Sequence, residues 1–193
     1  MRFRVLPVLL LALLLLRPAL ADLDADLSRA ESAYFDQGQR AQALTLLDPW
    51  VEKGRLEAIL LKADILSDSV LPDDLAQARA LYRRAHDMGS ADGAYELGMM
   101  LYQSDGFYDN PQQVMDWLRI ARDGGHPEAS FRLGQIAYYA GHLFPSLPAF
   151  ETYLREAAGA GHAEAALLLG KAYLSGVEGR LVAQPEEAVA MLE

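Results

Sequence analysis

The sequence contains the segment GHPEASFRLG at residues 125–134, and related segments stand at residues 161–170 (GHAEAALLLG) and 89–98 (GSADGAYELG). Each segment begins 36 residues after the one before it and ends in a Leu-Gly pair. A fixed period of this length is the signature of stacked structural repeats, because each repeat is one supersecondary unit that buries its apolar face against its neighbours. The period therefore indicates the fold class before any single element is assigned.

Two further columns recur with the same period. An apolar residue stands eleven positions before each opening glycine, and a short polar residue stands four positions before the apolar one. Their members are Ala78, Val114 and Phe150, and Asp74, Asn110 and Ser146. Short polar side chains accept hydrogen bonds from the free amides of a helix's first turn, and glycine commonly ends helices. Asn110 is the clearest predicted N-cap, because Pro111 suits the first helical position.

Each period therefore predicts two antiparallel helices, and the array predicts an all-α solenoid of helix pairs. The Leu-Gly pairs place a glycine inside each first helix, where glycine destabilises by about 1 kcal/mol relative to alanine. Its recurrence predicts that two helix backbones approach closely at that point. The predicted helices span residues 23–37, 40–53, 56–68, 74–88, 92–103, 111–123, 127–140, 146–159, 163–175 and 185 onward.

The composition narrows the classes of function. Hydrophobic residues make up 52% of the 193 residues, which is enough for a buried core. The formal net charge of −10 argues against nucleic acid as a partner, because an acidic chain repels phosphate backbones. The sequence has no cysteine, which excludes disulfides and thiolate metal sites.

Residues 1–21 have the pattern of a secretory signal peptide. Two arginines precede an apolar run at residues 5–16, and small residues follow at Ala19 and Ala21. The run is shorter than the roughly 20 apolar residues that span a membrane. We predict cleavage between Ala21 and Asp22, which leaves 14 basic against 27 acidic residues, a net charge near −13. The expected location is the periplasm or the exterior of the cell.

Beyond the signal peptide we predict a divergent N-terminal helix pair at residues 22–53 and repeats at residues 54–193, the last of them incomplete. Residues 89–178 resemble the Sel-one-like repeat (SLR) family, a relative of the tetratricopeptide repeat. The resemblance rests on the Gly-His-Pro-Glu-Ala and Gly-His-Ala-Glu-Ala openings, the Leu-Gly pairs that follow them, and the period of 36 residues, where tetratricopeptide repeats use 34. Departures are Gly93 in an alanine column, Ala63 in the glycine column, and a longer loop at residues 176–184.

The resemblance implies a non-catalytic adaptor or scaffold that holds other proteins together, with no cofactor. The sequence is consistent with a non-catalytic role, since we find no catalytic motif in it and expect no metal site. His126 and His162 occupy one column of the repeat, and we interpret them as turn residues. Equivalent positions in successive repeats lie roughly 10 Å apart, too far to share a metal ion.

The first helices carry the candidate binding surface. In repeats of this type their outward face lines the concave side, and a protein partner is expected to bind there. Register against the Leu-Gly pairs assigns to this face Asp92, Tyr95, Met99, Tyr102, Glu128, Phe131, Gln135, Tyr138, Glu164, Leu167 and Lys171. Tyr95 and Phe131 are expected to be exposed, whereas Tyr102 and Tyr138 suit either binding or packing between helices. An acidic column of Glu57, Asp92, Glu128 and Glu164 favours a basic segment of the partner.

Two functions fit this surface. The first is an exported scaffold that binds a protein partner through its concave face, without a stable membrane span once the signal peptide is removed. The alternative is a periplasmic accessory protein of polysaccharide binding or export, in which exposed aromatic rings stack on sugars. The sequence itself does not separate the two.

Overall fold

The structure is a computed structural model that describes residues 22–103, 111–140, 150–177, 181 and 183–192. It divides into two compact units, Met1–Met88 and Gly89–Glu193, and each is described by itself. Helices account for the regular structure of the described residues, and residues 177 and 181 form an isolated antiparallel bridge. Among these residues, none of the helices combines the length and the apolar character needed to cross a membrane.

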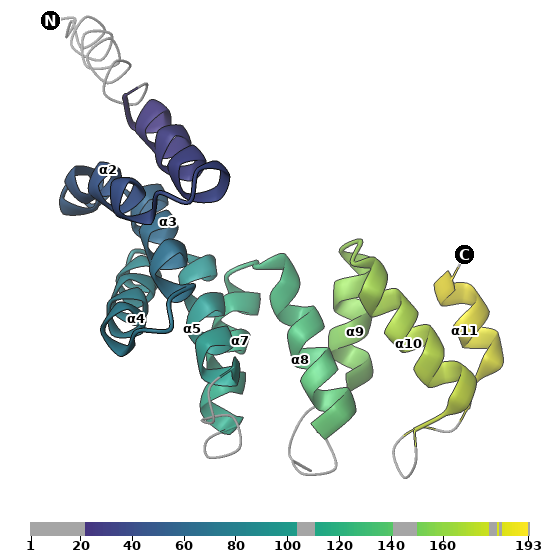
Figure 1. Ribbon diagram of the computed structural model, residues 1–193. Helices are drawn as coiled ribbons and strands as arrows, with labels where there is room; N and C mark the ends of the chain where they lie inside the picture. Colours follow the sequence, from purple (N-terminus) through teal and green to yellow (C-terminus); the bar gives the residue numbers. More distant parts are fainter. Residues whose placement is uncertain (1–21, 104–110, 141–149, 178–180, 182, 193) are drawn as a thin grey trace, which may run out of the picture. The chain divides into compact units, whose positions relative to one another are not determined.

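The N-terminal unit begins with helical residues 22–31, which continue into a short π-helix. The helical residues pack on α2, and the indole Nε1 of Trp50 donates a hydrogen bond of 2.8 Å to Asp26. Helix α3 in turn packs against both α2 and α4. The elements are η1 (Ser32–Asp36), α2 (Arg40–Glu52), α3 (Leu56–Ser67) and α4 (Pro72–Asp87) (Figure 1).

The C-terminal unit alternates first and second helices of successive repeats (Figure 1). Each first helix packs against the second helix that follows it. The first helices of the second and third pairs also contact the second helix that precedes them. The first helices are α5 (Ala91–Gln103), α8 (Pro127–Ala140) and α10 (Ala163–Ser175). The second helices are α7 (Pro111–Asp123), α9 (Phe150–Gly159) and α11 (Pro185–Leu192). The all-α solenoid of helix pairs predicted from the period is confirmed.

The predicted helix positions are confirmed to within two residues where the structure describes them. Pro111 opens α7 as expected, and α4 begins two residues earlier than predicted, at Pro72. The predicted caps Asn110 and Ser146, and the first turn of the helix predicted from residue 146, lie outside the described residues. The opening glycines take the left-handed conformation expected of helix ends, with φ of 88° at Gly125 and 92° at Gly161.

The repeat columns form the core. The Leu97, Leu133 and Leu169 column and the Ala78, Val114 and Phe150 column are all buried. Glycine in the Leu-Gly pairs lets a second helix approach, as predicted. A Cβ placed on Gly134 would stand 2.6 Å from Leu154 Cδ2 and 3.1 Å from the Leu154 backbone nitrogen, and one on Gly98 would stand 3.2 Å from Leu118. The side of each first helix that carries the glycine therefore faces the second helix of its pair, and the other sides of the first helix face away from it.

Candidate protein-interaction surface

The first helices of the C-terminal unit are joined by side chains that reach from one repeat to the next. Tyr95 of α5 stacks on the ring of His126, with centroids 4.0 Å apart and planes 11° from parallel. Phe131 of α8 stacks in the same way on His162, at 4.2 Å and 25°. The column that contains Tyr95 and Phe131 therefore faces along the stack of repeats, toward the start of the next first helix.

The predicted exposure of Tyr95 and Phe131 is wrong. Tyr95 is 9% exposed and Phe131 is 3% exposed. The physical reason is the stacked histidine, because each imidazole lies flat on the ring of the preceding repeat and excludes water from it. These two rings stabilise the contact between repeats and do not offer a surface to a partner.

His162 makes three separate contacts at this junction. Its Nδ1 accepts a hydrogen bond of 3.3 Å from the Ala165 amide and so caps the N-terminus of α10. That role leaves the proton on Nε2, which donates to Glu128 across 2.6 Å. With the stack on Phe131, the side chain closes the gap between α8 and α10 by packing, by a cap and by a charge-assisted hydrogen bond.

Arg132 extends this contact back to the previous repeat. Its Nε lies 3.2 Å from Glu128 Oε1 and donates a longer bond of 3.4 Å to the hydroxyl of Tyr95. A polar chain thus runs from Tyr95 through Arg132 and Glu128 to His162, linking α5, α8 and α10. Sequence reasoning missed Arg132, although the spacing of four residues from Glu128 is the usual signal of a helical ion pair.

His126 holds the equivalent place one repeat earlier but has fewer polar contacts. Its Nε2 lies 3.6 Å from Asp92 Oδ1, beyond hydrogen-bond distance, and its buried Nδ1 has no hydrogen-bond partner. Burial lowers the pKa of this imidazole, against the opposing attraction of Asp92 and Glu128. Burial also raises the pKa of the Tyr95 hydroxyl beneath it, which the hydrogen bond from Arg132 partly offsets. The stack on Tyr95 is therefore the main contact of His126.

The predicted acidic column is uneven. The carboxylate of Glu128 is half-buried and is engaged by both His162 and Arg132. Asp92 and Glu164 are exposed and remain available to a partner. Glu57 is also exposed, on α3 of the N-terminal unit. Two of the four predicted carboxylates therefore give the C-terminal unit an exposed acidic edge.

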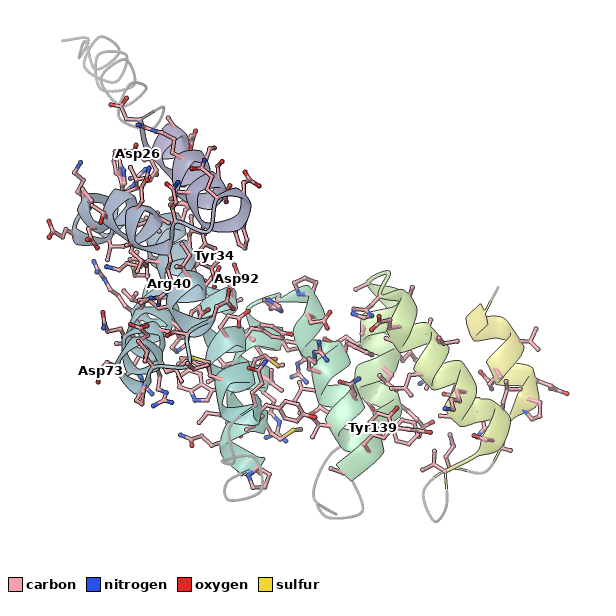
Figure 2. The ribbon with its side chains drawn as sticks, in the orientation of Figure 1. Asp26, Tyr34, Arg40, Asp73, Asp92 and Tyr139 are labelled. Atoms are coloured by element: carbon pink, nitrogen blue, oxygen red, sulfur yellow. The ribbon has the colours of Figure 1, made fainter. Side chains whose placement is uncertain are left out.

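The remaining predicted residues divide by exposure. Tyr102, Leu167 and Lys171 are exposed, whereas Met99, Gln135 and Tyr138 are half-buried. Tyr138 packs edge-on against Phe150, with centroids 5.3 Å apart, so packing is an established contact of that ring. Its neighbour Tyr139 is exposed at the C-terminal end of α8 (Figure 2). Leu174 occupies the corresponding end of α10 and is exposed as well.

Comparison with known proteins agrees with this geometry at the level of the fold. No protein-family model matches the chain, and no curated protein matches it significantly in sequence. One similar solved structure is a protective antigen present in uropathogenic Escherichia coli strains that displays an SLR fold, with a TM-score of 0.65 and 20% identity over 87% of this chain. Another is a Sel1 repeat protein from Oxalobacter formigenes, with a TM-score of 0.66 and 20% identity over 86% of this chain.

The chain has the Sel1-like repeat (SLR) fold. The fold expected from the Gly-His and Leu-Gly columns is thereby confirmed. The matched region covers 36% of the length of the antigen and 69% of the Oxalobacter formigenes protein. The chain thus spans about a third of the length of the antigen.

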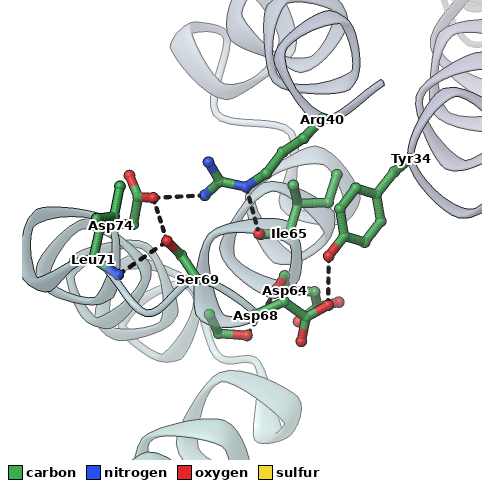
Figure 3. A network of polar contacts seen from close by, with 9 residues as sticks. Tyr34, Arg40, Asp64, Ile65, Asp68, Ser69, Leu71 and Asp74 are labelled. Atoms are coloured by element: carbon green, nitrogen blue, oxygen red, sulfur yellow. Dashed lines mark hydrogen bonds and ion pairs between the residues drawn. The ribbon is translucent and has the colours of Figure 1, made fainter. Parts of the chain in front are cut away.

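The N-terminal unit of this chain holds a separate polar network, which no sequence signal predicted (Figure 3). The Tyr34 hydroxyl donates to Asp68 across 2.7 Å, just beyond the end of α3. Arg40, the first residue of α2, forms an ion pair of 2.9 Å with Asp74 and donates to the Ile65 carbonyl. Hydrogen bonding from Ser69 and the Arg40 guanidinium lowers the pKa of Asp74. The network ties the N-terminal helices to the first helix pair.

The part of the chain that the structure describes has no cluster of side chains that could bind a metal ion. No three histidine or carboxylate side chains of these residues are arranged to hold an ion. His126 and His162 stack on rings of the preceding repeat, and His142 lies outside the described residues. The exposed side chains of the first helices remain the candidate site.

Proposed function

We propose that the chain is a non-catalytic adaptor that binds a protein partner on the exposed side of α5, α8 and α10. We define the first-helix surface as Met99, Tyr102, Gln135, Tyr139, Lys171 and Leu174. The observation that supports the proposal is the exposure of large apolar and aromatic side chains at equivalent ends of three neighbouring helices. Tyrosine is enriched at protein interfaces because it offers a large contact area and a polar end with little entropy to lose.

Charge indicates the kind of segment that the surface suits. Asp92 and Glu164 are exposed in the first turns of α5 and α10, and the chain as a whole is strongly acidic. A partner segment with apolar or aromatic side chains and a net positive charge would complement both features. Because rim charges are screened within roughly 8–10 Å at physiological ionic strength, its affinity is expected to fall moderately with added salt.

Replacing both Tyr102 and Tyr139 with alanine is expected to weaken partner binding at least tenfold, because tyrosine is enriched among the interface residues whose truncation costs about 2 kcal/mol or more. The chain is used to isolate its partner from a periplasmic extract, and the purified pair is then titrated by calorimetry. Ile120→Ala is the matched control, since Ile120 is also an exposed apolar residue but lies on the second helix α7. Equal loss in both variants, or none in the double variant with helical circular dichroism unchanged, contradicts the proposal.

Polysaccharide binding has less support than a protein partner. Of the aromatic rings that could have stacked on sugars, Tyr95 and Phe131 are covered by histidines and Tyr138 is packed on Phe150. The same isolation experiment tests this alternative. Recovery of a glycan in place of a protein, with binding that depends on Tyr139, would replace the adaptor proposal.

We further propose that the chain is exported and that residues 1–21 are removed. The support is the basic, apolar and small-residue order of that segment, which ends at Ala21. Intact-mass measurement of the protein recovered from the periplasm or culture medium is expected to find Asp22 as the first residue. A protein that keeps Met1 and stays in the membrane fraction contradicts the proposal.

A further inference from the structure

The contact between Tyr95 and His126 places a titratable ring at a buried junction between two repeats of the C-terminal unit. The imidazole lies flat on the phenol ring, with centroids 4.0 Å apart. Only 13% of the His126 side chain is exposed, and Tyr95 beneath it is 9% exposed. Histidine is the side chain whose charge ordinarily changes between about pH 5 and pH 8. The charge state of this imidazole therefore bears directly on the contact between α5 and α8.

Protonation would give the imidazole a second N–H group for which the junction has no acceptor. One nitrogen of a neutral imidazole carries a proton, whereas both nitrogens of the cation do. Nδ1 of His126 is buried and has no hydrogen-bond partner among the described residues. Nε2 lies 3.6 Å from Asp92 Oδ1, too far for a hydrogen bond. A buried donor without an acceptor is costly, above all when it is charged, so the closed junction favours the neutral ring.

The carboxylates that attract a proton to His126 compensate this cost only in part. They are Asp92 on α5 and Glu128 on α8. The Asp92 side chain is 63% exposed, so water screens its charge. Glu128 already accepts a hydrogen bond from His162 and forms an ion pair with Arg132. Desolvation therefore outweighs the attraction of both carboxylates, and burial lowers the pKa of His126.

We propose that the junction between α5 and α8 is pH-sensitive, and that protonation of His126 releases it and uncovers the ring of Tyr95. In the released state water hydrates both nitrogens of the imidazole, whereas in the closed state Nδ1 has no partner. A ring that is out of a partner's reach near neutral pH is thus opened to water in acid. The inference does not depend on the proposed function, because Tyr95 and His126 are not part of the first-helix surface.

The direction of the effect follows from the lowered pKa of His126. In the released state the imidazole has the ordinary histidine pKa of 6.5, and in the closed state its pKa is lower. Acid therefore protonates the released state first, and the closed junction loses stability as the pH falls below about 6.5. Exposed carboxylates titrate near pH 4, so measurements above about pH 5 keep the two effects apart.

Hydroxyl-radical footprinting of the purified protein, read by mass spectrometry, measures how far each aromatic ring is open to water. We expect labelling of Tyr95 to rise roughly threefold or more when the pH is lowered from about 7.5 to about 5. Phe131 is the internal control, because it lies under His162 in the same kind of stack. Its labelling is expected to stay constant, since Nε2 of His162 donates to Glu128 in either charge state.

Two variants assign the response to His126. His126→Phe keeps a ring on Tyr95 but cannot be protonated, so labelling of Tyr95 is expected to be equal at both pH values. Asp92→Asn removes an attraction that opposes release, so it is expected to enlarge the response. The exposure of Asp92 makes this second variant tolerable to the fold, and helical circular dichroism at both pH values checks each protein.

The inference is overturned if Tyr95 of the unmodified protein is labelled equally at the two pH values, or if His126→Phe keeps the full response. It is also overturned if labelling of Phe131 rises in parallel with that of Tyr95, because acid then loosens the repeats without regard to His126. A smaller response in Asp92→Asn would contradict it as well. None of these outcomes bears on the Tyr102 and Tyr139 test of the adaptor proposal.

Discussion

Gly134→Ala is expected to lower the free energy of unfolding by about 2 kcal/mol, although alanine is the better helix former. The added Cβ would stand 2.6 Å from Cδ2 and 2.7 Å from Cγ of Leu154, a side chain that is fully buried. The Leu154 backbone nitrogen at 3.1 Å blocks the alternative of moving the side chain alone. Helices α8 and α9 must therefore separate. Thermal unfolding followed by circular dichroism should show a midpoint lower by about 4–8 °C.

Two other glycines serve as controls for this change. Gly159 is the last residue of helix α9, and nothing lies within 4 Å of a Cβ built there. Gly159→Ala is therefore expected to raise the free energy of unfolding by about 0.4–1 kcal/mol. Gly98→Ala is expected to have an intermediate effect, because the nearest atoms of Leu118 stand 3.2 Å away and are side-chain atoms. Destabilisation of equal size at all three sites would show that helix separation is not the cause.

The period of 36 residues predicted most of the fold, because it depends on the residues that every repeat must bury. Leu97, Leu133 and Leu169 mark the buried side of each first helix, and the glycine after them marks the contact with the second helix. These features depend on the geometry within one helix pair. A single sequence carries that geometry as spacing, so element positions followed from it closely.

The exposure of the aromatic residues on the first helices was harder to predict. A first helix contacts not only the second helices beside it but also the start of the first helix in the next repeat. Tyr95 and Phe131 lie off the buried leucine column, which suggested exposure. The contact that covers them comes from His126 and His162, each 31 residues further along, and depends on how one repeat is set against the next. The histidine column was visible in the sequence, but its pairing with the aromatic column was not.

The tertiary contacts of the N-terminal unit could not be predicted from the sequence. Its polar network joins Tyr34 to Asp68 and Arg40 to Asp74, pairs that are 34 residues apart. The sequence does not say which of its many acids and bases pair with one another, because pairs so far apart follow no helical spacing. The helices of this unit followed from local pattern, whereas its tertiary contacts required the structure.

His162→Ala is expected to destabilise the C-terminal unit by about 2–3 kcal/mol. The change removes a helix cap, typically about 1 kcal/mol, a stacked ring worth roughly 0.5–1.5 kcal/mol, and a hydrogen bond to a carboxylate. These contributions overlap because one side chain makes all three contacts, and Arg132 still compensates Glu128, so the sum is not fully lost. Denaturant unfolding measures the effect.

His126→Ala is the matched control, because His126 has the same place in its repeat and the same stacked ring. Its Nε2 is 3.6 Å from Asp92 and its Nδ1 has no partner, so alanine removes the stack without breaking a hydrogen bond. We expect about half of the effect of His162→Ala. His162→Asn should recover the cap alone and His162→Phe the stack alone, so each should lie between His162→Ala and the unmodified chain. If His126→Ala proves as destabilising as His162→Ala, ring stacking accounts for the junction and the hydrogen bond from Nε2 to Glu128 adds nothing measurable.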